Sequence, residues 1–387
     1  MVLKHKEAGT VIGEFSILDT TLREGEQFAN TFFRSKDRID LAKRLDAFGV
    51  EHIEVSSPVV SDKAGEDIRA LRALNLRAKI FAHCRCEPSE VMAALDCGAQ
   101  GINLYQGSSM LMRLHSHGRS LEEIVGSAVG LIGMLKERGV FVRFSAEDAF
   151  RTEVADLTAI FDPICAAGVD RIGLPDTTGV ATPTQVMQRV SFFRERYGVE
   201  IEFHVHNDTG CAVANALTAL ESGANCIDTT VLGIGERNGI TSLSGLVARL
   251  YSVDRQLMRK YSLPALPELD RFVAELVGVP IPFNAPITGA TAFTHKAGVH
   301  TNAVLRQPQT YEALDPADFG LQRSIQVASR ITGKAAIRHR ASELGIELGE
   351  ADLRQVTRQI KSLADERPIC MADVDNAITS YCAAVAG

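Results

Sequence analysis

Short runs rich in β-branched and aromatic residues alternate with helical segments over the first 235 residues of this chain. The eight runs lie at residues 15–19, 52–56, 78–83, 101–105, 140–145, 171–174, 201–206 and 226–232. Segments between them, such as 35–48, 67–74 and 120–138, carry apolar residues at helical spacing, and several end at a glycine, a common stop signal. Eight alternating units predict an α/β fold of the (β/α)8 TIM-barrel type. A doubly wound open sheet is the alternative, but it usually has fewer strands, and no G-x-G-x-x-G follows the first run.

The pattern changes after about Ala265. Residues 284–289 have the composition of a linker, and the chain from 327 onward is mainly helical, without a further strand-rich module. We therefore expect a catalytic barrel over residues 1–265, a linker segment over 266–326 and a small helical subdomain over 327–387.

Composition narrows the classes of partner and location. The 387 residues are 45% hydrophobic and carry a net charge of -7 without a long basic run, which argues against nucleic acid or an anionic membrane surface as a partner. No uncharged apolar stretch of about 18 residues is present, and residues 1–15 lack the apolar core of a secretory signal. The eight cysteines are scattered, which is typical of reduced thiols in a cytoplasmic protein.

Polar side chains gather at six of the eight predicted strand ends. In a barrel of this type, catalytic residues lie at the carboxyl ends of the strands. These polar residues are Arg23, Glu24, Gln27, His83, Arg85, Arg143, Ser145, Glu147, Asp176, Thr177, His204 and His206, followed by the stretch 233–239. Buried ion pairs would explain any one of them, but packing alone does not explain six strand ends.

Two histidines, His204 and His206, flank one valine at the end of the seventh run. Alternate side chains of a strand point to the same face, so both imidazoles are expected to enter one site. An acidic residue from another strand end would complete a set of two histidines and one carboxylate, which leaves positions open on a divalent metal. The alternative is a pair of ordinary packed or polar histidines.

Six motifs in order resemble one family over almost the whole chain. They are LDTTLREGEQF (18–28), HGRS (117–120), RFSAED (143–148), HVHNDTG (204–210), GIGERNGIT (233–241) and FTHKAGVH (293–300). The chain resembles the homocitrate synthases of the acyl-CoA-condensing family, which also includes isopropylmalate and citramalate synthases. Glu24 fits the homocitrate synthases, because isopropylmalate synthases usually have aspartate there.

The resemblance implies a metal-dependent Claisen condensation of acetyl-CoA with an anionic 2-oxo acid, made irreversible by thioester hydrolysis and release of CoA. The implied ligands of the metal, which would be zinc, manganese or magnesium, are Glu24, His204 and His206. Arg23 would stabilise the alkoxide that develops on the keto oxygen. The residues implied to hold the substrate are Arg23, Gln27, His83, Arg143, Ser145 and Thr177.

The resemblance also assigns removal of the acetyl proton to His300 together with Glu147 and Tyr311. His300 and Tyr311 lie beyond the linker at 284–289, in a segment that caps the barrel of the partner subunit in this family. The resemblance therefore implies a homodimer with shared active sites. A lid over its own barrel is the alternative.

The chain departs from the family pattern on the fourth strand. Asn103 stands where lysine-pathway members carry an aspartate that helps to bind feedback lysine, and Tyr105 and Gln106 replace small or apolar residues. Glu202, the other lysine-binding position, is retained. Lysine feedback and the second substrate are thus open: phosphonopyruvate or oxaloacetate could replace 2-oxoglutarate, or the changes are neutral. A retro-Claisen lyase and a non-catalytic sensor are further alternatives.

Overall fold

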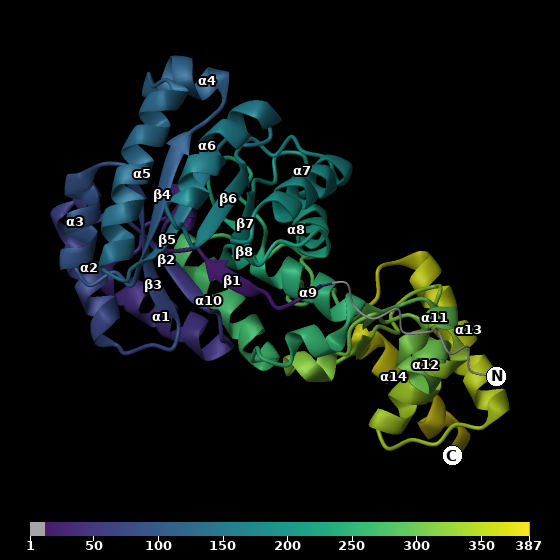
Figure 1. The fold of residues 1–387 in the computed structure, drawn as a ribbon. Coiled ribbons are helices and arrows are strands. Elements are labelled where there is room, and N and C mark those ends of the chain that lie inside the picture. The colour runs from purple at the N-terminus through teal and green to yellow at the C-terminus, as the bar shows by residue number, and fades with distance from the viewer. Residues whose placement is uncertain (1–11, 387) are drawn as a thin grey trace. The chain divides into compact units, whose positions relative to one another are not determined.

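The computed structural model describes residues 12–386, so most of the segment read for a secretory signal lies outside the description. Eight parallel strands form a closed barrel in sequence order (Figure 1). The strands are β1 Ser16–Asp19, β2 His52–Ser56, β3 Lys79–Arg85, β4 Gly101–Gly107, β5 Phe141–Glu147, β6 Arg171–Asp176, β7 Glu200–Val205 and β8 Cys226–Thr229. Pairing of β1 with β8 closes the ring. The predicted α/β barrel is confirmed.

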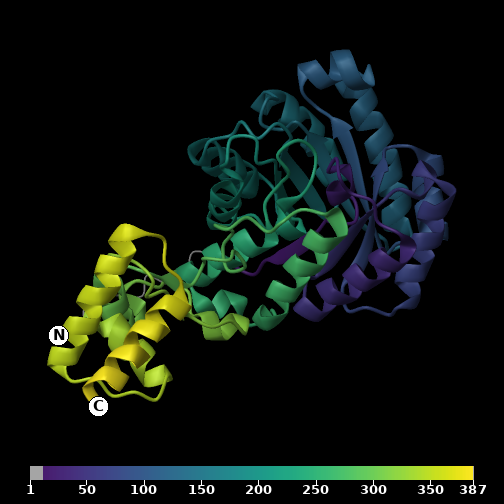
Figure 2. The ribbon, with the colours of Figure 1, turned by 180° about the vertical axis from the view of Figure 1, so that it is seen from behind.

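Helices surround this barrel in both views of the ribbon (Figures 1 and 2). They are α1 Ser35–Phe48, α2 Asp62–Ala73, α3 Pro88–Asp96, α4 Met110–Met112, α5 Leu121–Glu137, α6 Val154–Ala166, α7 Pro183–Arg196, α8 Ala212–Glu221, α9 Leu243–Val253 and α10 Leu266–Val277. Helix α2 begins at Asp62, whereas the sequence predicted a start at residue 67. The prediction was late because the first turn of the helix is polar and lacks the apolar spacing on which it relied. The Ser61 hydroxyl caps that turn by accepting from the N–H of Ala64.

Strand ends differ from the predicted ones by a few residues, and two of the differences shape the site. Strand β7 ends at Val205, and His206 instead forms an isolated antiparallel bridge with Ile240. Strand β8 ends at Thr229 rather than at 232, since the chain turns there into a short 3-10 helix, η4 (Val231–Gly233). The loop after β8 is thus drawn against the end of β7.

Aromatic rings close the barrel at the amino ends of its strands. The ring centroids of His52 and Phe81 are 4.7 Å apart, and those of Phe81 and Phe141 are 5.2 Å apart. The guanidinium of Arg171 lies 5.0 Å from the Phe141 ring centroid. Gly101 makes room for this stack, because a Cβ there would lie 2.5 Å from the Phe81 ring. These side chains pack the interior of the barrel near the amino ends of its strands.

The chain divides into two compact units, 1–281 and 282–387. The sequence-based boundary at 265 falls before α10, which packs on α1 through a cation–π contact between Arg44 and Phe272. The difference arises because α10 extends to Val277, and the linker-like stretch 284–289 begins only after this helix. The division of the remainder into segments 266–326 and 327–387 stays a prediction.

The second unit is mainly helical, as predicted, and its helices pack around one apolar core (Figure 2). Its elements are β9 Thr294–His295, α11 Gly298–Arg306, β10 Ser324–Ile325, α12 Lys334–Glu343, α13 Glu350–Glu366 and α14 Met371–Ala386. Strands β9 and β10 pair in parallel. Within the described part of the chain, none of the helices has the length and apolar character needed to cross a membrane. The cysteines are all free thiols.

Candidate active site

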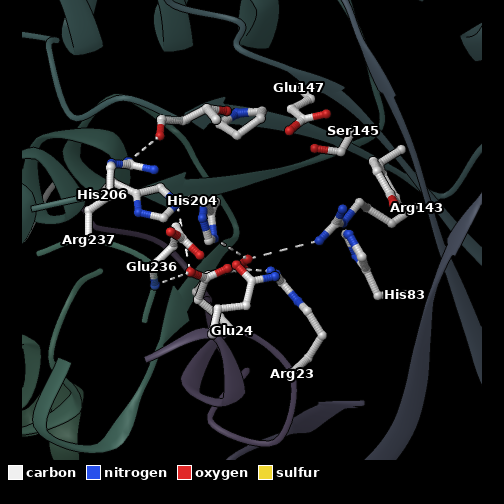
Figure 3. A pocket seen from close by; sticks show the side chains of 15 residues that line it. Arg23, Glu24, His83, Arg143, Ser145, Glu147, His204, His206, Glu236 and Arg237 are labelled. Carbon is white, nitrogen blue, oxygen red and sulfur yellow. Dashed lines mark hydrogen bonds and ion pairs between the residues drawn. The ribbon is translucent and has the colours of Figure 1, made fainter. Parts of the chain in front are cut away.

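A polar pocket of about 180 Å³ opens at the carboxyl ends of the barrel strands (Figure 3). It contains ten of the twelve strand-end residues that the sequence singled out: Arg23, Glu24, Gln27, His83, Arg143, Ser145, Glu147, Thr177, His204 and His206. The other two do not line it: Arg85 pairs with Glu90 at 2.8 Å, and the Asp176 carboxylate accepts from the N–H of Ala181 at 2.9 Å. Five further residues complete its lining, namely Tyr105, Pro175, Asp228, Glu236 and Arg237. Most of the predicted strand-end residues therefore line one common pocket.

Three side chains converge on one wall of this pocket. Glu24, His204 and His206 each present a ligand atom, and these atoms all lie within 4.8 Å of one another. Glu24 begins the short helix η1 (Glu24–Gln27) after β1, and the Glu236 N–H donates to its Oε1 at 2.9 Å. The His206 Nε2 lies 3.9 Å from the same oxygen. Two imidazoles and one carboxylate thus surround a small common volume.

The protonation states of this trio suit a divalent cation. Burial lowers the pKa of His204 and of His206 to about 4, which leaves both rings neutral at pH 7 with a lone pair to donate. Burial would raise the pKa of Glu24, but Arg23 and the two histidines outweigh it and lower that pKa to about 2. The buried Nδ1 of His206 makes no hydrogen bond in the described structure. The donor set therefore fits a metal with open positions.

A buried carboxylate, Glu54 on β2, organises the opposite wall. Its Oε1 accepts hydrogen bonds from Arg23 Nε at 2.7 Å and from the Thr20 hydroxyl at 2.9 Å. Its Oε2 lies 3.3 Å from Arg143 Nη2 and 3.4 Å from His83 Nδ1. Burial would raise the pKa of Glu54, but Arg23, His83 and Arg143 hold it well below its usual range. Glu54 thus fixes three of the predicted substrate-binding side chains.

Arg143 is almost fully buried and lies among three carboxylates. Its Nη2 is 2.6 Å from Glu202 Oε1 and 3.9 Å from Asp228 Oδ2, in addition to its contact with Glu54. Glu202 is shared with a second arginine, because Arg171 Nη1 donates to its Oε2 at 3.2 Å. Arg143 therefore belongs to a buried ion-pair network.

The residues of β4 that depart from the family pattern lie beside this network. Asn103 is completely buried, and its amide Nδ2 donates to Glu54 Oε2. Tyr105, two residues along β4, stacks on His83 with ring centroids 4.3 Å apart. A second carboxylate at position 103 would meet Glu54 directly and would require a shared proton or another cation. With the neutral Asn103 in this place, Glu54 has no second carboxylate beside it, and Arg23 and Arg143 neutralise its negative charge.

Smaller polar groups line the upper pocket near β5 and β6. Ser145 has room because residue 173 is glycine, where a Cβ would lie 2.7 Å from the Ser145 hydroxyl. The Thr177 hydroxyl accepts from the N–H of Asp148 at 2.9 Å, which leaves its own hydrogen to donate into the pocket. Glu147 ends β5 at the same level (Figure 3). These groups are able to bind a polar substrate.

His300 and Tyr311 belong to the second unit. Their rings are in contact, with centroids 4.2 Å apart, and Tyr311 is 46% exposed. His300 is in α11, and Tyr311 directly follows a short 3-10 turn. The structure thus brings these two predicted residues to each other.

Glu54 and Asp228 were not predicted from the sequence, although both contact predicted site residues. Glu54 interrupts the buried strand HIEVS, and Asp228 interrupts the buried strand CIDT. A charged residue inside a short apolar strand needs a buried partner, and this signal could have indicated both positions. Glu236 and Arg237 lie in the motif 233–239 that the sequence did single out.

The barrel and its site agree with the comparison with known families. The HMGL-like family model matches residues 14–273, and the chain belongs to this family. A second model, homocitrate synthase post-HMGL domain-like, matches residues 287–368. The chain is 47% identical over 371 residues to mitochondrial homocitrate synthase of Penicillium rubens, covering 96% of this chain and 78% of the relative. The predicted resemblance to homocitrate synthases is thereby confirmed.

Other relatives have related names. The cytosolic isozyme of homocitrate synthase from Saccharomyces cerevisiae is 45% identical and spans 97% of this chain and 88% of its own length. A probable 2-isopropylmalate synthase from Methanopyrus kandleri is 37% identical over 90% of this chain and 70% of its own. Among solved structures, HMG-CoA lyase from Bacillus subtilis matches with a TM-score of 0.62 at 20% identity, covering 70% of this chain and 95% of its own. That likeness shows the fold alone.

Proposed function

We propose that this protein condenses acetyl-CoA with 2-oxoglutarate to give homocitrate and free CoA. One observation carries the proposal: a metal-ligating trio and two arginines line the same pocket, in a chain whose homocitrate synthase relatives extend over both units. In the reaction, the acetyl methyl carbon loses a proton and attacks the keto carbon. Water then cleaves the thioester and CoA leaves.

The residues of the pocket divide this work between its two walls. Glu24, His204 and His206 would hold zinc, manganese or magnesium, and the bound ion supplies a Lewis acid that polarises the keto group. Arg23, fixed by Glu54 at 2.7 Å, would donate to the keto oxygen as negative charge develops there. Because this arginine is held before substrate arrives, little reorganisation is needed.

The other predicted residues would orient the substrate and move its proton. Arg143 would bind the acid group distant from the ketone, because a guanidinium can form two parallel hydrogen bonds with a carboxylate or phosphonate. Its helpers in that task would be Gln27, His83, Ser145 and Thr177. Glu147, with His300 and Tyr311 from the second unit, would take the acetyl proton.

Another 2-oxo acid is the second candidate substrate, and Asn103 with its neighbour Tyr105 favours it. Asn103 is neutral where the family pattern has a charge, so the pocket suits an acid group such as the phosphonate of phosphonopyruvate, or the shorter oxaloacetate. A lyase is disfavoured, since the second unit matches a model described as homocitrate synthase post-HMGL domain-like.

A panel assay tests the reaction and its substrate. We expect CoA release from acetyl-CoA with 2-oxoglutarate, followed with a thiol reagent, and little or no inhibition by lysine. Asn103 lacks the negative charge that would attract lysine's ammonium group. The panel includes phosphonopyruvate and oxaloacetate, with pyruvate as a control that has no distal acid group. Release with none of these acids would refute the condensation, and micromolar inhibition by lysine would contradict the role given to Asn103.

We propose a homodimer in which the second unit of one subunit completes the active site of its partner. His300 and Tyr311 contact each other within the second unit, which begins at Pro282, shortly after the last barrel helix α10 ends at Val277. A segment connected in this way can be exchanged between subunits, which is a known route to dimers. Both contributions would then be needed in trans.

Mixing two inactive variants tests this arrangement. His204→Ala removes a metal ligand and His300→Ala removes the second-unit base, so each homodimer is expected to be inactive. After subunit exchange, a heterodimer with shared sites contains one intact site, and an even mixture should recover about a quarter of the parent activity, assuming random exchange of subunits. Exchange is verified with differently tagged subunits. Confirmed exchange without recovered activity would show that the lid acts on its own barrel.

A cytoplasmic location is part of the proposal. Eight free cysteines without a disulfide fit a reducing compartment. The relatives differ in the location that their names give: the Penicillium rubens protein is called mitochondrial, and one Saccharomyces cerevisiae isozyme is called cytosolic.

A further inference from the structure

We propose that Asp228 is a positioning residue for the metal: it fixes the ring of His204 and connects this ligand to Arg143. The inference rests on the metal site of the proposed function and deepens it. It names a carboxylate outside the ligand trio on which metal affinity depends.

Neighbouring strands place the two side chains together. Asp228 is on β8 and completely buried, and His204 is on the adjacent strand β7. The Oδ2 of Asp228 lies 3.0 Å from His204 Nδ1. Because a carboxylate only accepts hydrogen bonds when ionised, this contact selects the tautomer of His204 with hydrogen on Nδ1. The lone pair of Nε2 is then free for the metal.

The same contact fixes the direction of the ring. Figure 3 shows His204 beside Glu24, and the ring centroids of His204 and His206 are 5.0 Å apart. A carboxylate on the far nitrogen of a metal-bound imidazole holds the ring in place and makes its lone pair more basic. Asp228 therefore prepares His204 to bind before the metal arrives.

Asp228 also contacts the substrate-binding side of the pocket. Its Oδ2 lies 3.9 Å from Arg143 Nη2, so one oxygen lies between a proposed metal ligand and the proposed acid clamp. Asp228, Glu202 and Cys226 form a second cluster with metal-ligating atoms within 4.8 Å. The arginines argue against a cation there, since Glu202 is already paired with Arg143 at 2.6 Å. Asp228 thus acts through His204 rather than as a ligand.

Metal titration without substrate tests the assignment. We expect Asp228→Ala to weaken binding of Zn²⁺ or Mn²⁺ by about 10- to 100-fold, measured by competition with a chromophoric chelator, because partners in this position typically have effects of that size. Asp228→Asn should lie between the parent and the alanine variant, since its amide oxygen still accepts from Nδ1–H but carries no charge. The visible absorption of bound Co²⁺ should shift in the alanine variant as the ligand geometry loosens.

Asp270→Asn is the matched control. It alters an equally buried carboxylate on α10 that is bonded to Ser244 and does not line the pocket, so metal affinity should not change. If Asp228→Ala does not fold, Asp228→Asn decides the question. Metal affinities within twofold of the parent, with an unchanged Co²⁺ spectrum, would overturn the proposal. Metal binding that depends on Asp228 in a protein that releases no CoA with any 2-oxo acid would instead refute the proposed function and leave this inference standing.

Discussion

Removal of the divalent metal is expected to abolish CoA release, and His204→Ala is expected to do the same. The pocket holds its trio of ligand atoms within 4.8 Å, and burial keeps both imidazoles neutral and ready to bind at pH 7. Without the ion, the developing charge on the keto oxygen is left to Arg23. We expect a loss of about 1000-fold or more, equivalent to about 4 kcal/mol of transition-state stabilisation.

The measurement is CoA release by the protein after exhaustive treatment with a chelator, with metal content followed by elemental analysis. Activity should return on addition of zinc, manganese or magnesium to the chelated parent but not to His204→Ala. His339→Ala is the matched control, since this histidine lies in α12 of the second unit and outside the pocket. Full activity of a protein shown to be metal-free would rule the site out.

Arg143→Ala is expected to have the largest effect on stability. Arg143 lies 2.6 Å from Glu202 and 3.3 Å from Glu54, and all three side chains are buried. Its removal leaves buried carboxylates without their cation, which typically costs about 3–5 kcal/mol. The same variant should lose activity with acidic 2-oxo acids. The free energy of unfolding in urea and CoA release with 2-oxoglutarate measure the two effects.

The stability defect of Arg143→Ala should depend on pH in a defined direction. Burial already raises the pKa of Glu202 to about 7 in the parent, where Arg143 opposes the rise. In the variant, the pKa of folded Glu202 lies still higher and above its unfolded value. Its protonated form is then favoured in the folded state at low pH, and that stability is lost as pH rises through the folded pKa. The defect should therefore be smaller at about pH 6 than at about pH 8.

Arg196→Ala is the control for loss of an arginine. Arg196 pairs with Asp162 at 2.7 Å on the exposed side of α7, and such surface pairs contribute little to stability. If Arg143→Ala unfolded like the parent at pH 8 and used 2-oxoglutarate as well as the parent, both the pairing and the clamp would be wrong.

The sequence was sufficient for the barrel because its signals are local. Each strand is a short apolar run and each helix a periodic one, so the alternation can be counted without knowing any contact. The predicted helix start was wrong where the local signal was weak. Helix α2 begins at Asp62, after the cap residue Ser61, but its first turn is polar and does not contribute to the apolar pattern. The boundary between the two units could not be predicted from local sequence patterns, because α10 belongs to the barrel through its contacts with α1.

The residues at the strand ends were readable for a related reason. Carboxyl ends of parallel strands meet at one rim, so the positions of Glu24, His204 and Arg143 in the sequence already implied a common pocket. Which residue pairs with which was not readable. The sequence left the partners of Arg143 open, whereas in the structure Arg143 contacts Glu202, Glu54 and Asp228.

The amino-acid sequence by itself thus determined the repeat of strands and helices and the kinds of side chain at the mouth of the barrel. Only the tertiary structure decided that Glu54 on β2 holds Arg23, and that Asp228 on β8 holds His204. Both pairs join residues that are 24 or more positions apart, and Arg23 reaches Glu54 from the turn after β1. Pairing of β1 with β2 and of β7 with β8 brings these side chains together, and the cost of leaving a buried charge unpaired then selects the partners.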